Sequence, residues 1–135
     1  MKRFLPFAVV LVLVATLTAA AAIGASGKRR PSSHPGLALS GHVAGLQPGQ
    51  RARMTIRVKN RLRRTIHLRS VKTTVRAAAR GCSGTNLVVA AYRGRLRIRP
   101  GRWARVSVSV RMRADSPSAC QGKVFPLTFK GQASA

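Results

Sequence analysis

The sequence predicts an all-β domain, an antiparallel sandwich of about seven short strands held by one disulfide. Apolar and polar residues alternate with a period of two over most of the chain after residue 36, which is the spacing of half-buried strands. Turn-forming residues recur every 8 to 12 positions, roughly, and no stretch after residue 25 has a helical period. The chain has two cysteines, which can form the disulfide. This pattern is typical of an immunoglobulin-like sandwich.

Residues 1–25 read as a signal peptide or membrane anchor that precedes the fold. Lys2 and Arg3 stand before an almost wholly apolar run, Phe4 to Ala25, as in a secretory signal. A run of roughly 20 apolar residues also suffices for a hydrophobic helix that spans a bilayer. Basic residues follow at 28–30, which argues against translocation of the downstream part. A cleaved signal and an uncleaved single-pass anchor both stay open, and either predicts an extracytoplasmic protein, secreted or associated with the envelope.

Residues 26–36 hold two prolines, two glycines and no apolar side chain, which predicts a flexible basic linker. The folded domain then spans 37–135, enough for one core but small enough to benefit from a staple. In an exported chain Cys82 and Cys120 pair most simply with each other. A free thiol pair and an intermolecular bridge are the alternatives. By the loop-entropy model, an intramolecular bond between Cys82 and Cys120 would stabilise the fold by roughly 3 to 4 kcal/mol.

The first half of the domain predicts three strands. Apolar positions within 37–43 indicate an opening strand, which the glycine- and proline-containing segment 45–49 ends. The strand at 51–59 has an apolar inner row and an outer row that is almost entirely basic. After a turn at 60–64 the apolar positions switch from even to odd, which predicts a bulge near Ser70.

A loop at 77–86 carries Cys82 to the second half of the domain. Strand candidates follow at 87–92 and 95–98, separated by Gly94. The turn at 99–102 contains the Pro-Gly pair that reverses the chain.

Two strands close the domain. Residues 104–112 show the clearest alternation of the whole chain. The last strand, at 124–130, places Phe125, Leu127 and Phe129 on one side and is entered through Cys120. The disulfide would therefore join the mid-domain loop to the start of the final strand.

The most specific motif is Cys-Gln-Gly-x-x-Phe-Pro-Leu-Thr-Phe at 120–129. With the turns at 45–49 and 99–101, it resembles a small secreted immunoglobulin-like domain of uncharacterised exported proteins of actinobacteria. The resemblance covers nearly all of the chain after the linker and implies a β-sandwich, one disulfide and an extracytoplasmic setting, with no established activity. This chain has Arg61 after Asn60, where that family tends to have proline. Its outward positions carry Arg where Thr, Ser or neutral residues are usual.

Charge dominates the composition, because 26 Lys and Arg face a single acid, Asp115, and the formal net charge is +25. Such a chain attracts polyanions and repels its own copies. Arg outnumbers Lys, 20 to 6, and its planar fork suits bidentate contacts with phosphate or carboxylate. A high genomic GC content explains the Arg bias equally well.

Catalysis is not predicted. Acid–base chemistry generally needs paired carboxylates or a histidine with an orienting acid, whereas Asp115 stands alone in a turn. His34, His42 and His67 are interpreted as surface residues, and no Cys or His spacing matches a zinc site. The glycines show no phosphate-loop order. We therefore expect no enzyme, no cofactor, no metal and no small-molecule substrate.

The positive candidates for binding are basic residues on three predicted strands. They are Arg51, Arg53, Arg57, Lys59, Arg95, Arg97, Arg99, Arg105, Arg111 and Arg113. If neighbouring strands pair, these rows merge into one cationic sheet, although a merely solvated surface is the competing interpretation. Aromatic residues are too few for base stacking, so any nucleic-acid binding would be driven by phosphate and independent of sequence.

Two functions follow as hypotheses. The first is a non-catalytic interaction module of the cell envelope that adheres to anionic polymers or lipid headgroups. The second is a soluble cationic effector that binds extracellular DNA or the membranes of competitors. Retention at the producing cell favours the first, and release into the medium favours the second.

Overall fold

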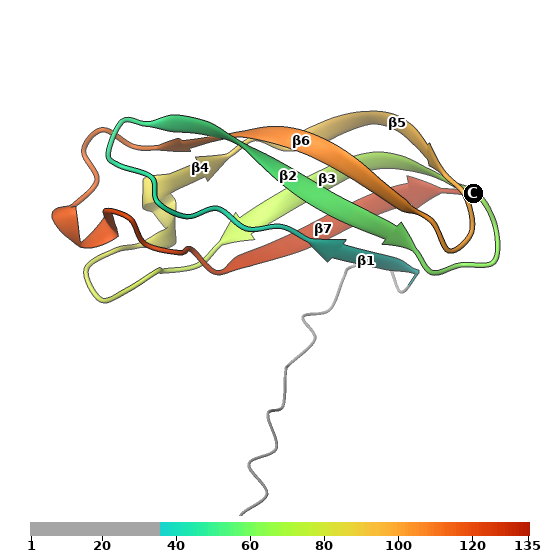
Figure 1. Cartoon of the computed structure of the whole chain (residues 1–135), viewed down its shortest axis with the longest axis horizontal. Helices are drawn as coiled ribbons and strands as arrows, with labels where there is room; N and C mark the ends of the chain where they lie inside the picture. The colour runs from blue at the N-terminus through green and yellow to red at the C-terminus, as the bar shows by residue number, and fades with distance from the viewer. Residues whose placement is uncertain (1–35) are drawn as a thin grey trace, which may run out of the picture.

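A computed structural model describes residues 36–135, which form two antiparallel sheets around one core (Figure 1). Its seven strands are β1 (Leu37–Ser40), β2 (Arg51–Asn60), β3 (Ile66–Val75), β4 (Leu87–Val89), β5 (Tyr92–Ile98), β6 (Trp103–Met112) and β7 (Leu127–Ser134). Two short 3-10 helices are η1 (Gly84–Asn86) and η2 (Ser118–Cys120). The all-β prediction is confirmed for this range. The predicted signal or anchor at 1–25, its hydrophobic helix and the linker up to residue 35 lie outside the described residues.

The strand order is β1-β2-β6-β4 in the larger sheet and β5-β3-β7 in the smaller one. A constant-type immunoglobulin domain also divides seven strands into four and three, but its fifth strand lies in the larger sheet and its sixth in the smaller. Here β5 pairs with β3, and β6 pairs with β2 and β4. The number and division of the strands therefore agree with that architecture, while the fifth and sixth strands lie in exchanged sheets.

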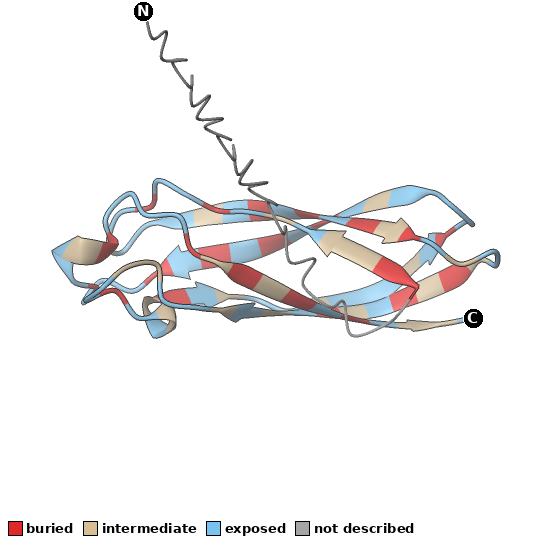
Figure 2. Cartoon of the chain, turned by 90° about the horizontal axis from the view of Figure 1, so that it is seen from below, coloured by how far each residue is buried: buried red, intermediate tan, exposed pale blue. Residues whose placement is uncertain are grey.

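Alternating burial along the strands builds the core (Figure 2). Met54, Ile56 and Val58 of β2 point inward and join buried residues of both sheets in one cluster. The register of β3 shifts between Leu68 and Ser70, which confirms the predicted bulge. The extra residue moves the inward positions of β3 from even to odd numbers, so both halves of the strand still face the core.

The predicted disulfide is confirmed, with a Cα–Cα distance of 5.1 Å between Cys82 and Cys120. Both cysteines are buried, and neither is free. The bond joins the loop after β3 to helix η2, at the end of the sandwich opposite the C-terminus (Figure 1). Cys120 is the last residue of η2, so a loop separates it from β7 and it does not open the final strand. Disulfides persist in oxidising compartments, so the bond indicates such an environment.

Three predicted boundaries were wrong. Gly94 lies inside β5. The break between β4 and β5 falls at residues 90–91, where the chain passes from pairing with β6 to pairing with β3. Val43 is buried but lies beyond the end of β1. The last strand begins at Leu127, because Pro126 before it has no N–H for a ladder. Phe125 still packs in the core from the loop.

Across residues 36–135 no helix has the length and apolar character needed to cross a bilayer.

Candidate anion-binding surface

Basic side chains gather on the outward side of the larger sheet, which we call the first face. Even-numbered residues of β2 and β6 are buried or half-buried, so odd-numbered ones project to solvent. β2 and β6 are hydrogen-bonded neighbours, so their outward rows lie side by side. The basic residues of the first face are Arg51, Arg53, Arg57, Lys59, Arg105 and Arg111.

Like charges stand directly opposite each other on the first face. Arg51 pairs across the sheet with Arg111, and Arg57 pairs with Arg105. Like charges at opposed positions of an antiparallel pair destabilise it. The only acidic residue of the chain, Asp115, lies beyond the end of β6 and cannot separate these pairs. An anion seated between the two guanidinium groups of a pair would remove the repulsion.

Two shallow hollows occupy the two ends of the first face. One, of about 520 Å³, is bordered by Arg51, Arg53 and Arg111, with the exposed Val88 beside them. The other, of about 590 Å³, is bordered by both members of the opposed pair of Arg57 and Arg105. Its remaining lining is Ser40, Gly41, His42 and Thr55. Each hollow thus offers two or three guanidinium groups to one bound group.

Trp103 extends the first face past the end of the Arg rows. Its side chain is 49% exposed, and its cross-strand partner is Lys59. The guanidinium carbon of Arg57 lies 4.6 Å from the centroid of the indole, and Nζ of Lys59 lies 5.3 Å from it. These are cation–π contacts. They draw two cations of the first face toward the indole, and these cations lie over the ring surface on which a base would otherwise stack.

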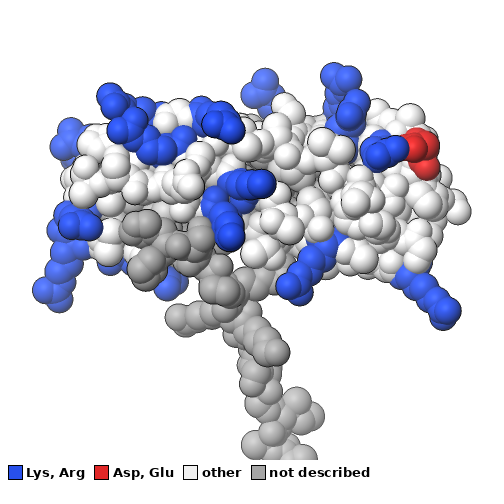
Figure 3. Space-filling view, turned by 180° about the vertical axis from the view of Figure 1, so that it is seen from behind, with Lys and Arg blue, Asp and Glu red and all other residues white. Residues whose placement is uncertain are grey.

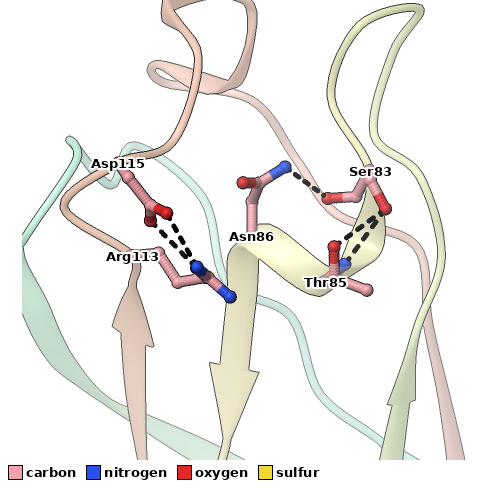
Figure 4. Close-up of polar contacts among 5 residues, drawn as sticks. All are labelled: Ser83, Thr85, Asn86, Arg113 and Asp115. Carbon is pink, nitrogen blue, oxygen red and sulfur yellow. Dashed lines mark hydrogen bonds and ion pairs between the residues drawn. The ribbon is translucent and has the colours of Figure 1, made fainter.

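Arg113 differs from the other candidates, because it forms an ion pair with Asp115 (Figure 4). Its Nε donates to Oδ1 at 2.9 Å and its Nη2 donates to Oδ2 at 2.7 Å, a bidentate contact at the surface. The hydrogen bond from Arg113 lowers the pKa of Asp115, and the carboxylate raises the pKa of Arg113. Arg113 is therefore engaged, and we do not include it in the first face.

The other predicted residues lie elsewhere. Arg95 and Arg97 project from β5 in the smaller sheet, so their row does not merge with that of β2 and β6. Arg99 lies in the turn between β5 and β6, where its carbonyl accepts from N–H of Arg102. Basic side chains are spread over the side of the molecule shown in Figure 3, and acidic atoms appear there only beside a basic side chain.

Besides Arg69 on β3, sequence reasoning missed three basic residues that border one hollow of the smaller sheet. Lys72 on β3 lies directly opposite Lys130 on β7, and Arg93 on β5 pairs with Ser70. All three are exposed. Lys72 and Lys130 are far apart in the sequence, and only the pairing of β3 with β7 shows that they are neighbours. The alternation along β5 could have identified Arg93, but Gly94 was interpreted as a break between two strands.

Metal-ligating and acid–base groups are sparse in the described part of the chain. No group of three or more His, Cys, Asp or Glu residues between 36 and 135 is arranged to hold a metal ion. His42 borders a hollow of the first face, and His67 lies opposite Arg97 on the other sheet. The surface of the domain therefore offers mainly positive charge and N–H donors.

Comparison of the chain with protein-family models, with curated proteins and with solved structures finds no match.

Proposed function

We propose that this chain is a non-catalytic, exported interaction module of the cell envelope, built on an immunoglobulin-like sandwich, that binds a linear polymer bearing phosphate groups through its first face. The observation that carries the proposal is the opposed pairing of Arg51 with Arg111 and of Arg57 with Arg105 on adjacent strands. This arrangement costs stability in the free protein and favours a bound anion. Arg suits phosphate because its fork donates two parallel hydrogen bonds.

A polymer fits the first face better than a bilayer does. The large apolar side chains exposed in the described part of the chain are Val88, Trp103 and Val124. Trp103 is the first residue of β6, whereas Val88 pairs with Arg111 near the other end of that strand, so these two do not share a patch. Trp103, the residue best suited to a membrane interface, has cations over its ring. The two hollows are about 20 Å apart, judged from the six-residue spacing of the Arg pairs along β2. A chain of repeated anions can fill both.

The setting outside the cytoplasm is part of the proposal. It is supported by the disulfide, which needs an oxidising environment, and by the apolar N-terminal sequence. Fractionation of the producing cells, with N-terminal sequencing of the product, tests it. Recovery from the wall or membrane fraction is expected. Recovery from the medium alone would favour the soluble cationic effector instead.

The binding test compares the salt dependence of affinity for duplex DNA, used as a generic phosphate polymer. About 5 to 8 phosphate contacts predict a decrease of log affinity with log salt of about 0.9 per contact, independent of sequence. The variant Arg51→Thr/Arg53→Thr/Arg57→Thr should lower the slope by up to about three contacts. Thr is favoured in strands and leaves the inner row of β2 unchanged, so the fold should persist.

The matched control is Arg63→Thr/Arg80→Thr/Lys123→Thr, which removes the same charge from exposed positions outside the strands. It should lose less affinity than the first-face variant. Equal loss in the two variants, both folded, would show that total charge rather than the first face binds. Tighter association with vesicles of phosphatidylglycerol and phosphatidylcholine than with the duplex would replace the polymer by a membrane.

A further inference from the structure

The outward side of the smaller sheet is a second cationic surface, which we call the second face. β5 carries three exposed Arg residues, and Lys72 and Lys130 oppose each other on β3 and β7. A hollow of about 250 Å³ lies among Lys72, Arg93 and Lys130. The basic residues of the second face are Lys72, Arg93, Arg95, Arg97 and Lys130.

The two faces point in opposite directions. Inward residues of both sheets form one core, so the outward sides of the sheets lie on opposite surfaces of the sandwich. Packed sheets are about 10 Å apart, which is far less than the distance over which a stiff polymer bends, about 50 nm for duplex DNA. A stiff polymer that lies along one face therefore cannot turn around the domain to reach the other. The second face stays open to a second polymer.

Free copies of the domain should not provide the link themselves. Each carries the same strong positive charge on both faces, and like surfaces repel. The long edge strand β5 presents Arg93, Arg95 and Arg97, and charged edge strands resist pairing with another chain. Association of copies thus requires a polyanion between them.

We propose that one copy of this domain cross-links two anionic polymer chains, one on each face. This inference rests on the proposed function of the first face and adds a second cationic surface. The partner is again a chain of phosphate groups, because the opposed Lys72 and Lys130 repeat the like-charge pairing of the first face. The activity is thus to join polymers as well as to bind them.

A two-duplex capture assay tests the proposal. A duplex of about 20 base pairs is fixed to beads, and a fluorescent copy of the same duplex is added with the protein. This duplex is longer than β2, which extends over about 34 Å. The parent should retain the fluorescent duplex. The first-face variant Arg51→Thr/Arg53→Thr/Arg57→Thr should still bind one duplex in solution but retain less than about a tenth as much of the second.

The second-face variant Arg93→Thr/Arg95→Thr/Arg97→Thr should lose capture in the same way. If it does not fold, judged by thermal unfolding, Lys72→Thr/Lys130→Thr replaces it on the same face. The scattered control, Arg63→Thr/Arg80→Thr/Lys123→Thr, should capture as the parent does. Sedimentation with duplex in excess should show one protein bound to two duplexes.

The outcomes separate the two proposals. Failure of the parent to bind any duplex would overturn the proposed function. Binding of a single duplex without capture of a second would overturn cross-linking alone. Equal capture by both face variants and the scattered control would also overturn it, because the link would then come from total charge. A complex of two proteins with two duplexes would replace cross-linking by one copy with polymer-induced dimerisation.

Discussion

Asn60 shows how one residue closes the end of the sandwich. It is fully buried at the end of β2. Its Nδ2 donates to the carbonyl of Arg64 at 2.7 Å and to the carbonyl of Ile98 at 3.0 Å, while its Oδ1 accepts from N–H of Leu62 at 2.9 Å. The side chain at the end of β2, in the larger sheet, thus joins the β2–β3 turn to the end of β5 in the smaller sheet. The sequence placed Asn60 at a turn, but its contact with Ile98 depends on the packing of the two sheets.

Asn60→Ala should lower the free energy of unfolding by about 2 to 4 kcal/mol. Three hydrogen bonds are lost, and two carbonyls and an N–H lose their partner in or near the core. Urea unfolding measures the loss. Asn86→Ala is the control, since its amide donates to the carbonyl of Ser83 at the surface, and it should cost less than about 1 kcal/mol. A similar cost for both would mean that the buried contacts of Asn60 do not stabilise the domain.

At the scale of the elements, alternation predicted the strands whose two sides differ most. β2 and β6 have apolar residues inward and charged or hydroxyl residues outward, so their period is unmistakable. The bulge in β3 was also readable, because an extra residue changes the parity of the buried positions. The cysteine pair was predictable because a chain with two cysteines offers one internal partner for each.

The assignment of strands to sheets could not be read in this way. Local alternation states which side of a strand is buried but not which strand lies beside it. The chain crosses from β4 to β5 within residues 90–91, and that crossing separates Arg95 and Arg97 from the first face. For the same reason the pairing of Lys72 with Lys130 was invisible. Three of the eleven basic residues that we assign to the two faces, Lys72, Arg93 and Lys130, were therefore not predicted, and the separation of the two faces emerged only from the packing of the sheets.

Replacement of the disulfide tests how the elements resist their own charge. Cys82→Ser/Cys120→Ser should lower the free energy of unfolding by roughly 2 to 5 kcal/mol. The disulfide closes residues 82–120 into a ring in the unfolded chain, and the variant loses that constraint. The loss of stability should be larger at low salt than at about 0.1 M or above, where the Debye length falls to roughly 10 Å and self-repulsion is screened. Unfolding in urea, which adds no ions, measures both. A cost that does not vary with salt would contradict a role for repulsion.

For the whole molecule, the long axis and the two faces have separate roles. The start of β1 and the C-terminus lie at one end of the sandwich, and η2 lies at the other (Figure 1). The disulfide closes the end that carries η2. The two cationic faces flank this axis. Attachment of the domain at the end that holds β1 and the C-terminus would therefore leave both faces exposed along their full length.

The exposed pair of Arg113 with Asp115 has a consequence for behaviour in acid. Proteins usually unfold in acid because many paired carboxylates must take up protons, and this chain has one acidic side chain for that process. The pKa of Asp115 is lowered from 3.8 in the folded state, so its small contribution is present at higher pH and disappears only as pH falls through the lowered value.

The urea midpoint of the parent should therefore stay almost constant from about pH 5 to about pH 4, a range in which ordinary proteins begin to lose stability. Asp115→Asn should have a slightly lower midpoint than the parent throughout that range, and the two should converge in stronger acid. A steep decrease for the parent above about pH 4 would show that another group titrates with folding. A domain that already carries nearly its full positive charge at neutral pH has little further charge to gain on acidification, and its fold should tolerate acidic surroundings.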